Sequence, residues 1–223
     1  MQPPNPTPIF HITAIDNLAS IAVQGGLFSK NQAATNGLRA ANIAYEHIQG
    51  RRAVRTVPIA PGGTLHDYVP FYFAPRSPML YTVNLGNVPG CDYRQDDIVH
   101  LVSTAQTVFN GGHKIVFTDI HAALDYARFF DDLASLNEID WTIFFETPLR
   151  EGYCLYWQNR HTPPHHMRRM EIRQAEFLVS NQLPIAAISE IGVRTARAAA
   201  RVKDAFAGSG WTPEVRVVPG WYF

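Results

Sequence analysis

The amino-acid sequence predicts an α+β fold with a mixed or antiparallel sheet, and three observations support this prediction. Short apolar runs such as PIFHI, IVHLV and KIVFT recur along the chain and are typical of strands. Helical patterns separate some of these runs but not others, so the spacing does not repeat as βαβ units. With 46% apolar and 17% charged positions, 223 residues suffice for one buried core. We therefore expect a single domain over residues 1–223.

The first third of the chain carries the signals of one strand and two helices. PIFHI is the expected strand, and Asp16 is a candidate N-cap for the helix that follows, which Gly25-Gly26 would end. The apolar face of this helix would consist of Leu18, Ile21 and Ala22. Residues 42–50 are expected to form a second short helix, followed by a basic cluster of Arg51, Arg52 and Arg55.

The remaining elements follow from apolar patterning and turn residues. FYF and MLYTV are expected to be strands on either side of Pro75 and Pro78, and IVHLV and KIVFT are two more. HAALDYARFFDDLASL has the clearest amphipathic pattern and is expected to be a helix, with Asp119 near its start. Near the C-terminus, the strands AAISEIGV and EVRVV would flank the helix ARAAARVKDAFAG, which ends on Gly208.

Charge and cysteine usage indicate a compartment more than a function. Nineteen basic residues balance nineteen acidic ones, so an anion-binding surface can arise only by local clustering. Cys91 and Cys154 lie far apart, without CxxC spacing, and the start MQPPNPTPIF has no apolar signal core. No run of eighteen apolar residues is present. We expect a soluble cytoplasmic protein without membrane association.

Common metal and nucleotide motifs are absent from the sequence. His161, His165 and His166 include an i,i+4 pair, but Pro163-Pro164 would break the helix that aligns it, and no HExxH or cysteine set accompanies it. The chain has neither a Walker A sequence nor GxGxxG, so a nucleotide must be held in another way. We expect no metal site.

Residues 150–176 mix aromatic and basic side chains more densely than any other part of the chain. Tyr153 and Trp157 offer stacking faces to unpaired bases, and arginines contact phosphate and stack on bases. This mixture suits single-stranded nucleic acid, but a solvated loop with partly buried aromatics explains it equally well. The candidate DNA-binding residues are Tyr153, Trp157, Arg160, Arg168, Arg169 and Arg173, together with Arg76 of the segment HDYVPFYFAPRSPMLY.

Five blocks together resemble the DarT family of DNA ADP-ribosyltransferase toxins. They are TPIFHITAIDNLASI, IAYEHIQGRR, PGGTLHDYVPFYFAPRSPMLY, FTDIHAALDYARFF and QAEFLV, and the resemblance extends from about Pro8 to Tyr222. It implies an ADP-ribosyltransferase-like fold in which helices flank a central sheet. It also implies NAD as a consumed co-substrate and the modification of a base, most often thymine, in single-stranded DNA.

The resemblance assigns roles to individual residues. Glu176 of QAEFLV matches the catalytic glutamate, and Arg52 matches a catalytic arginine that also contacts NAD. The further NAD-contacting positions it implies are His11, Ile12, Thr13, Ser20 and Phe28. The loop before Glu176 corresponds to the loop that presents the substrate in this class of transferase.

The chemistry of the implied reaction explains these residue types. Cleavage of the nicotinamide glycosidic bond builds positive charge on the ribose, and a carboxylate that binds a ribose hydroxyl orients the sugar and stabilises that charge. Thymine N3 must lose a proton, and the resemblance points to Arg52 for its removal. A guanidinium is effectively always protonated, so clamping the NAD pyrophosphate or stabilising deprotonated thymine are equal alternatives for Arg52.

Other functions remain open at this point. The acceptor could be guanine, RNA or a protein with the same NAD chemistry, or the chain could be a non-enzymatic single-strand binder in which Glu176 only flanks a strand or helix. Residues 87–97 and the 150–173 loop vary in the family, and the preference for a DNA sequence would be set in the loop. The resemblance also implies a neutralising antitoxin, DarG, whose macrodomain removes the modification.

Overall fold

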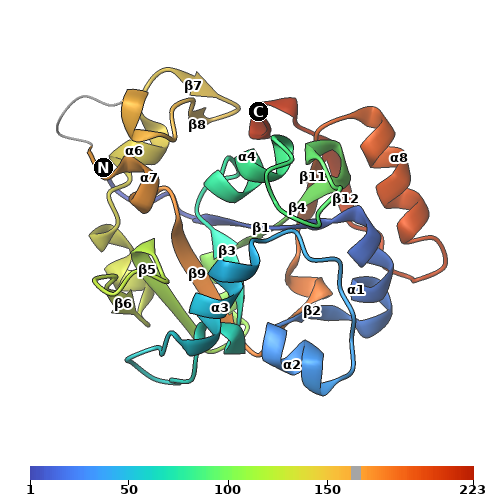
Figure 1. Cartoon of the computed structure of the whole chain (residues 1–223), viewed down its shortest axis with the longest axis horizontal. Helices are drawn as coiled ribbons and strands as arrows, with labels where there is room; N and C mark the ends of the chain where they lie inside the picture. The colour runs from blue at the N-terminus through green and yellow to red at the C-terminus, as the bar shows by residue number, and fades with distance from the viewer. Residues whose placement is uncertain (162–166) are drawn as a thin grey trace.

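The computed structural model describes residues 1–161 and 167–223, and these form one eight-stranded mixed sheet with helices around it (Figure 1). Neighbouring strands are antiparallel, except that β11 and β12 at one edge of the sheet are parallel. The strand order is β12 (Glu214–Val217), β11 (Glu190–Val193), β4 (Ile98–Thr104), β1 (Pro8–Ala14), β3 (Tyr68–Tyr72), β9 (Ala175–Ser180), β5 (Ile115–His121) and β6 (Phe129–Phe130).

Helices and two small ribbons surround this sheet. Figure 1 shows α1 and α8 beside its β11–β12 end, and α6 and α7 near β5. The small ribbons pair β2 (Gly26–Phe28) with β10 (Gln182–Pro184) and β7 (Leu149–Arg150) with β8 (Tyr153–Cys154). The helices are α1 (Leu18–Gln24), α2 (Lys30–Thr35), α3 (Glu46–Val54), α4 (Pro78–Asn84), α5 (Ala105–Asn110), α6 (Thr142–Phe145), α7 (Arg169–Ile172) and α8 (Ala196–Ala205).

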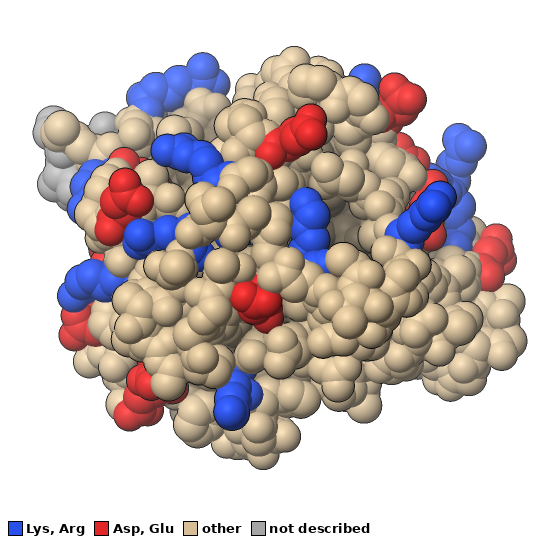
Figure 2. Space-filling view, turned by 60° about the horizontal axis from the view of Figure 1, so that its bottom comes forward, with Lys and Arg blue, Asp and Glu red and all other residues tan. Residues whose placement is uncertain are grey.

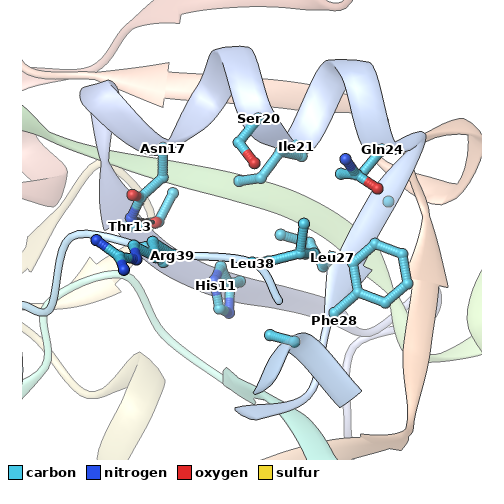
Figure 3. A pocket seen from close by; sticks show the side chains of 13 residues that line it. His11, Thr13, Asn17, Ser20, Ile21, Gln24, Leu27, Phe28, Leu38 and Arg39 are labelled. Atoms are coloured by element: carbon cyan, nitrogen blue, oxygen red, sulfur yellow. Dashed lines mark hydrogen bonds between the residues drawn. The ribbon is translucent and has the colours of Figure 1, made fainter. Parts of the chain in front are cut away.

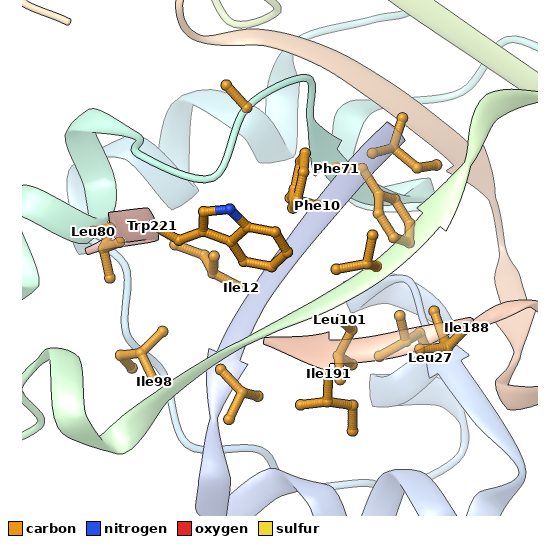
Figure 4. Close-up of a cluster of buried hydrophobic side chains, with 14 of the residues drawn as sticks. Phe10, Ile12, Leu27, Phe71, Leu80, Ile98, Leu101, Ile188, Ile191 and Trp221 are labelled. Atoms are coloured by element: carbon orange, nitrogen blue, oxygen red, sulfur yellow. The ribbon is translucent and has the colours of Figure 1, made fainter. Parts of the chain in front are cut away.

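Aromatic side chains fix the packing on both parts of the sheet. Phe73 packs edge-on against Phe117, Phe177 and Trp141, with ring centroids 5.4–6.4 Å apart. Around β1, Phe10 packs against Trp221 at 5.1 Å, in the cluster drawn in Figure 4. Such edge-on pairs add to area burial and define ring orientation, so β1, β3 and β9 are held rigidly in the centre of the molecule.

The first predicted helix is confirmed in extent but not in its cap. Gly25 ends α1 with a φ of 71°, a conformation that glycine adopts without steric cost. The N-cap is Asn17, and Asp16 instead lies in a 3-10 turn, where its carboxylate accepts a hydrogen bond from the Tyr93 hydroxyl at 2.9 Å. The second predicted helix is α3, displaced toward the C-terminus so that Arg51 and Arg52 lie within it.

The strand predicted at MLYTV is wrong, because these residues form α4. Ser77 is its N-cap, with the hydroxyl accepting from the Leu80 N–H at 3.2 Å, and Pro78 occupies the first helical position. Proline at this position loses no helical hydrogen bond, so the Ser-Pro pair was the overlooked helix signal.

The helix predicted over HAALDYARFFDDLASL is also wrong. Its residues form a turn, the short strand β6 and a 3-10 helix, Leu133–Glu138. Two hydrogen bonds join Arg128 to Asp119, and the Phe130 ring stacks on Phe117 at 5.3 Å. These contacts outside the segment outweigh its helical periodicity. Within the described part of the chain no helix is long and apolar enough to cross a membrane.

Candidate active site

Glu176 is buried at the second position of β9, in the middle of the sheet. Its residue is 2% exposed, and it lies opposite Tyr72 of β3. Its backbone N–H donates to Thr118 Oγ1 at 3.1 Å, and its Oε1 accepts from the Ala122 N–H at 3.3 Å. A buried carboxylate is costly unless it is paired, so the position requires a cationic partner.

Arg52 in the last turn of α3 supplies that partner. Its Nη1 lies 2.9 Å from Glu176 Oε1 and 2.7 Å from Oε2, so one nitrogen bridges both carboxylate oxygens. The other terminal nitrogen, Nη2, is buried and has no hydrogen-bond partner among the described residues. A buried donor without a partner is destabilising. The site thus holds a free donor directly beside the carboxylate.

His121 at the end of β5 is a third polar residue of this centre, which the sequence analysis missed. Its Nδ1 is 3.8 Å from Glu176 Oε1, but that nitrogen accepts a hydrogen bond from the Ala123 N–H at 3.0 Å and so carries no proton. Burial lowers the pKa of His121, more than the Glu176 charge raises it. The ring is therefore neutral and makes no ion pair. The residue was overlooked because its segment was predicted to be helical.

Tyr72 completes the surroundings of the pair. Burial, and then the neighbouring Glu176 charge, raise the pKa of its phenol, while Arg52 acts in the opposite direction. The hydroxyl therefore remains protonated. Only the strand register between β3 and β9 identifies this residue as a neighbour of Glu176, so the sequence pattern alone did not reveal it.

Four of the residues predicted to contact NAD lie around one cavity. His11, Thr13, Ser20 and Phe28 line a cavity of about 120 Å³ between β1, α1 and β2. Figure 3 shows Ser20 and Gln24 extending from α1 and Phe28 closing one end. Further polar residues at the cavity are Asn17, Gln24 and Arg39, which the sequence analysis did not single out.

His11 presents a defined tautomer to this cavity. Its Nδ1 lies 2.8 Å from the Pro70 carbonyl oxygen, which can only accept, so Nδ1 donates and Nε2 is left as an acceptor. Burial lowers the pKa of His11, so the ring is neutral. Ile12 departs from its prediction, because its side chain is 6% exposed within the hydrophobic core and does not line the cavity. Alternation along β1 directs it away from its neighbours.

The predicted DNA-binding residues divide into exposed and buried groups. Arg160 and Arg168 are exposed; Arg168 lies over the Tyr126 ring at 5.1 Å and pairs with Glu171 at 2.8 Å. Trp157, Arg76 and Arg160 line a second cavity of about 230 Å³. Tyr153 is 8% exposed and packs against Phe10 at 5.6 Å.

Direct phosphate contacts by Arg169 and Arg173 are contradicted by their complete burial. Arg169 donates to Glu146 Oε2 at 2.7 Å and to the Ile143 carbonyl at 3.1 Å. Arg173 donates to the Arg76 carbonyl at 3.1 Å, and burial lowers its pKa to about 10. Because α7 packs inward, these side chains connect the segment before β9 to α6 and to the residues after β3.

Metal and surface charge add little to this site. His165 and His166 lie outside the described residues, and the described ones contain no cluster of three or more metal-binding side chains. Figure 2 shows basic and acidic side chains interspersed on the face it displays, with a hollow beside one basic side chain. On that face, local geometry matters more than a large field of one sign.

Comparison with known proteins places this geometry in a family context. The family model described as "ssDNA thymidine ADP-ribosyltransferase, DarT" matches residues 10–223. A "DNA ADP-ribosyl transferase" of Thermus sp. (strain 2.9) is 42% identical over 99% of this chain and 98% of its own length. The structure of Thermus sp. 2.9 DarT in complex with ADP-ribosylated ssDNA superposes with a TM-score of 0.88 at 41% identity, covering 100% of this chain and 99% of that one. Thermus sp. 2.9 DarT in complex with NAD+ gives 0.84 at 39% identity, with full coverage of both chains. The predicted fold is thereby confirmed.

Proposed function

The chain belongs to the DarT family of ssDNA thymidine ADP-ribosyltransferases, and we propose that Glu176 and Arg52 transfer ADP-ribose from NAD to thymine in single-stranded DNA. The observation that carries the assignment of these two residues is their buried ion pair, in which Nη2 of Arg52 remains without a partner. Residues 1–223 act as one catalytic domain in this proposal.

Glu176 has the role of stabilising the ribose as nicotinamide leaves. One of its oxygens accepts a ribose hydroxyl, and the negative charge offsets the positive charge that develops on the sugar. Oε2 accepts from Arg52 Nη1 at 2.7 Å, and a carboxylate oxygen can accept a second hydrogen bond, so the ribose hydroxyl can bind there. The Ala122 N–H contact to Oε1 and the Thr118 contact to the backbone keep the carboxylate in place.

Arg52 serves the acceptor base in the same proposal. Its unpartnered Nη2 donates to a carbonyl oxygen of thymine and stabilises the negative charge that forms when N3 releases its proton to solvent, before N3 bonds to the ribose carbon that nicotinamide leaves. A guanidinium donates and does not accept, so this role fits its chemistry better than proton abstraction. His121 is neutral beside Glu176, so it adds no second positive charge to compete with Arg52.

The nicotinamide part of NAD enters the cavity lined by His11, Thr13, Ser20 and Phe28. The free acceptor on His11 Nε2 suits the carboxamide N–H₂ of nicotinamide, and the Phe28 ring offers a stacking face. Exposed Arg39 at the same cavity supplies positive charge for the pyrophosphate. This arrangement supports the NAD-binding assignment of four predicted residues and adds Arg39.

The cellular setting follows from the family. We place the protein in the cytoplasm, as the toxin of a toxin–antitoxin pair whose antitoxin is a DarG-like macrodomain protein that removes the modification. The neighbouring reading frame should then encode a macrodomain, and its expression should restore growth to cells that produce the active chain. Failure of the macrodomain to restore growth would contradict this pairing.

An acceptor panel tests the proposed reaction. The purified chain is incubated with labelled NAD and with single-stranded DNA, duplex DNA, RNA or protein, and adducts are located by nucleoside mass spectrometry. We expect ADP-ribose on thymidine of single-stranded DNA only. An adduct on guanosine or RNA would retain the NAD chemistry and overturn the acceptor, and salt-sensitive binding without nicotinamide release would leave only a single-strand binder.

A further inference from the structure

The second cavity of the molecule is enclosed mainly by aromatic side chains. Tyr81 of α4 lies 4.9 Å from the Trp157 ring and 5.0 Å from the Phe223 ring, and Trp157 and Phe223 are 5.6 Å apart. Its volume is about 230 Å³. Aromatic faces around a space of this size suit one planar ring system.

Two features make this cavity a constructed site. Paired hydrogen bonds between the Phe223 backbone and the Gln95 amide, at 2.6 and 2.8 Å, hold the Phe223 backbone beside the cavity. Arg76 is 7% exposed and lies 4.6 Å above the Phe223 ring, and its Nε is buried without a partner among the described residues. Aromatic faces combined with a spare guanidinium donor match a nucleobase next to a phosphate.

The cavity is connected to the catalytic centre by short, buried segments. Arg76 follows Tyr72, the cross-strand neighbour of Glu176, by four residues, which span at most about 14 Å even when fully extended. Arg173, three residues before Glu176, donates to the Arg76 carbonyl. At about 3.4 Å per stacked nucleotide, a backbone span of about 14 Å corresponds to roughly four nucleotides, so the cavity lies within a few nucleotides of the catalytic centre.

We infer that this cavity, lined by Tyr81, Trp157, Phe223 and Arg76, is a subsite that holds a base flanking the acceptor thymidine in the same single strand. The inference rests on the proposed DNA-modifying function and extends it to substrate selection. By stacking one base and contacting its phosphate, the subsite would fix the register of the strand so that the acceptor reaches Glu176 and Arg52.

The test combines a protein variant with a set of oligonucleotides. Tyr81→Ala removes a stacking face from a partly exposed residue, and Trp211→Ala, a partly exposed aromatic packed on Phe206 beside α8, is the matched control. Each protein is assayed for transfer and for binding by fluorescence anisotropy, with strands that carry one abasic position at each site flanking the acceptor. Nicotinamide release is recorded in parallel.

At one flanking position, we expect the abasic strand to bind wild-type protein about 5- to 150-fold more weakly, as typical stacking contributions predict. Tyr81→Ala should show a similar loss with the intact strand and little further loss with the abasic one, whereas Trp211→Ala should behave as wild type. Equal sensitivity of Tyr81→Ala and wild type to every abasic position would overturn the subsite, and so would a weakened NAD affinity with unchanged DNA binding. Absence of transfer by wild type would instead reject the proposed function, while the anisotropy data would still decide on the subsite.

Discussion

Buried arginines occur in two regions of this molecule, and their partners differ. Arg52 pairs with a carboxylate that is itself 2% exposed and keeps Nη2 without a partner. Arg169 pairs with Glu146, whose side chain is 27% exposed, and also donates to the Ile143 carbonyl. The first arrangement leaves a donor for a substrate, and the second connects chain segments. Partner burial therefore distinguishes the arginine that we propose to be catalytic from one that connects chain segments, where local composition does not.

Among the arginine variants, the largest effect should come from the loss of the spare donor of Arg52. Arg52→Lys retains a positive charge opposite Glu176 but removes the second terminal nitrogen, and the two groups are not equivalent in such sites. We expect the rate of ADP-ribose transfer to fall on the order of 100-fold, as for loss of one donor aimed at developing charge. Single-turnover kinetics would measure this, and an unchanged rate would mean that Nη2 contributes nothing.

Buried histidines should contribute to acid sensitivity in addition to Asp67 and Asp97, whose pKa values are lowered because burial is outweighed by hydrogen bonds, whereas the buried arginines stay charged at low pH. Burial lowers the pKa of fully buried His100 from 6.5 to about 4. The unfolded chain then binds more protons than the folded one, so this contribution is complete above pH 6.5 and is lost as the pH falls toward 4, by about 3 kcal/mol in all.

Denaturant unfolding of wild type and His100→Gln across this pH range provides the measurement. Glutamine retains a donor for the Pro75 carbonyl, which His100 Nε2 contacts at 2.9 Å, but does not titrate. The variant should therefore lose less stability on acidification than wild type. If the free energy of unfolding falls equally with pH in both proteins, the assignment to His100 is contradicted. The loss would then come from other groups such as His11, His66 and His121, whose pKa values are also lowered.

Arg169→Met should affect stability and leave chemistry intact. Removing a buried partner of an ion pair is typically costly, but Glu146 can regain water, so we expect a loss of about 2 kcal/mol in the free energy of unfolding. Transfer measured at a temperature where the variant is folded should approach the wild-type rate. A variant of full stability with weakened DNA binding would reverse the structural assignment of Arg169.

Replacement of Arg168, the residue next to Arg169, should have the smallest effect, and it should act on DNA binding rather than on stability. Arg168→Ala removes an exposed cation, so the free energy of unfolding should change by less than about 0.5 kcal/mol. If Arg168 contacts phosphate, DNA affinity should weaken for all sequences and the salt dependence of binding should decrease by about one unit. Titrations at several salt concentrations distinguish this from an unaffected salt slope, which would remove Arg168 from the DNA surface.

The sequence predicted the fold class more successfully than it predicted the helices or the burial of the basic residues. The strands β1, β4 and β5 could be predicted because buried strands consist of short apolar runs, which are visible in the sequence. His121 and Tyr72 could not be found in this way, since their proximity to Glu176 depends on pairing between distant strands. The basic composition of residues 150–176 suggested that Arg169 and Arg173 are exposed, but the packing of α7 buries both side chains.

Transfer by Glu176→Gln, with binding of NAD and single-stranded DNA measured on the same protein, tests the central claim most directly. The amide keeps the shape of the side chain but lacks the charge that offsets the developing positive charge on the ribose. We expect transfer to fall by at least about 100- to 1,000-fold while both affinities remain near wild type. Transfer at the wild-type rate by a folded variant would contradict the assignment of Glu176 as the catalytic carboxylate.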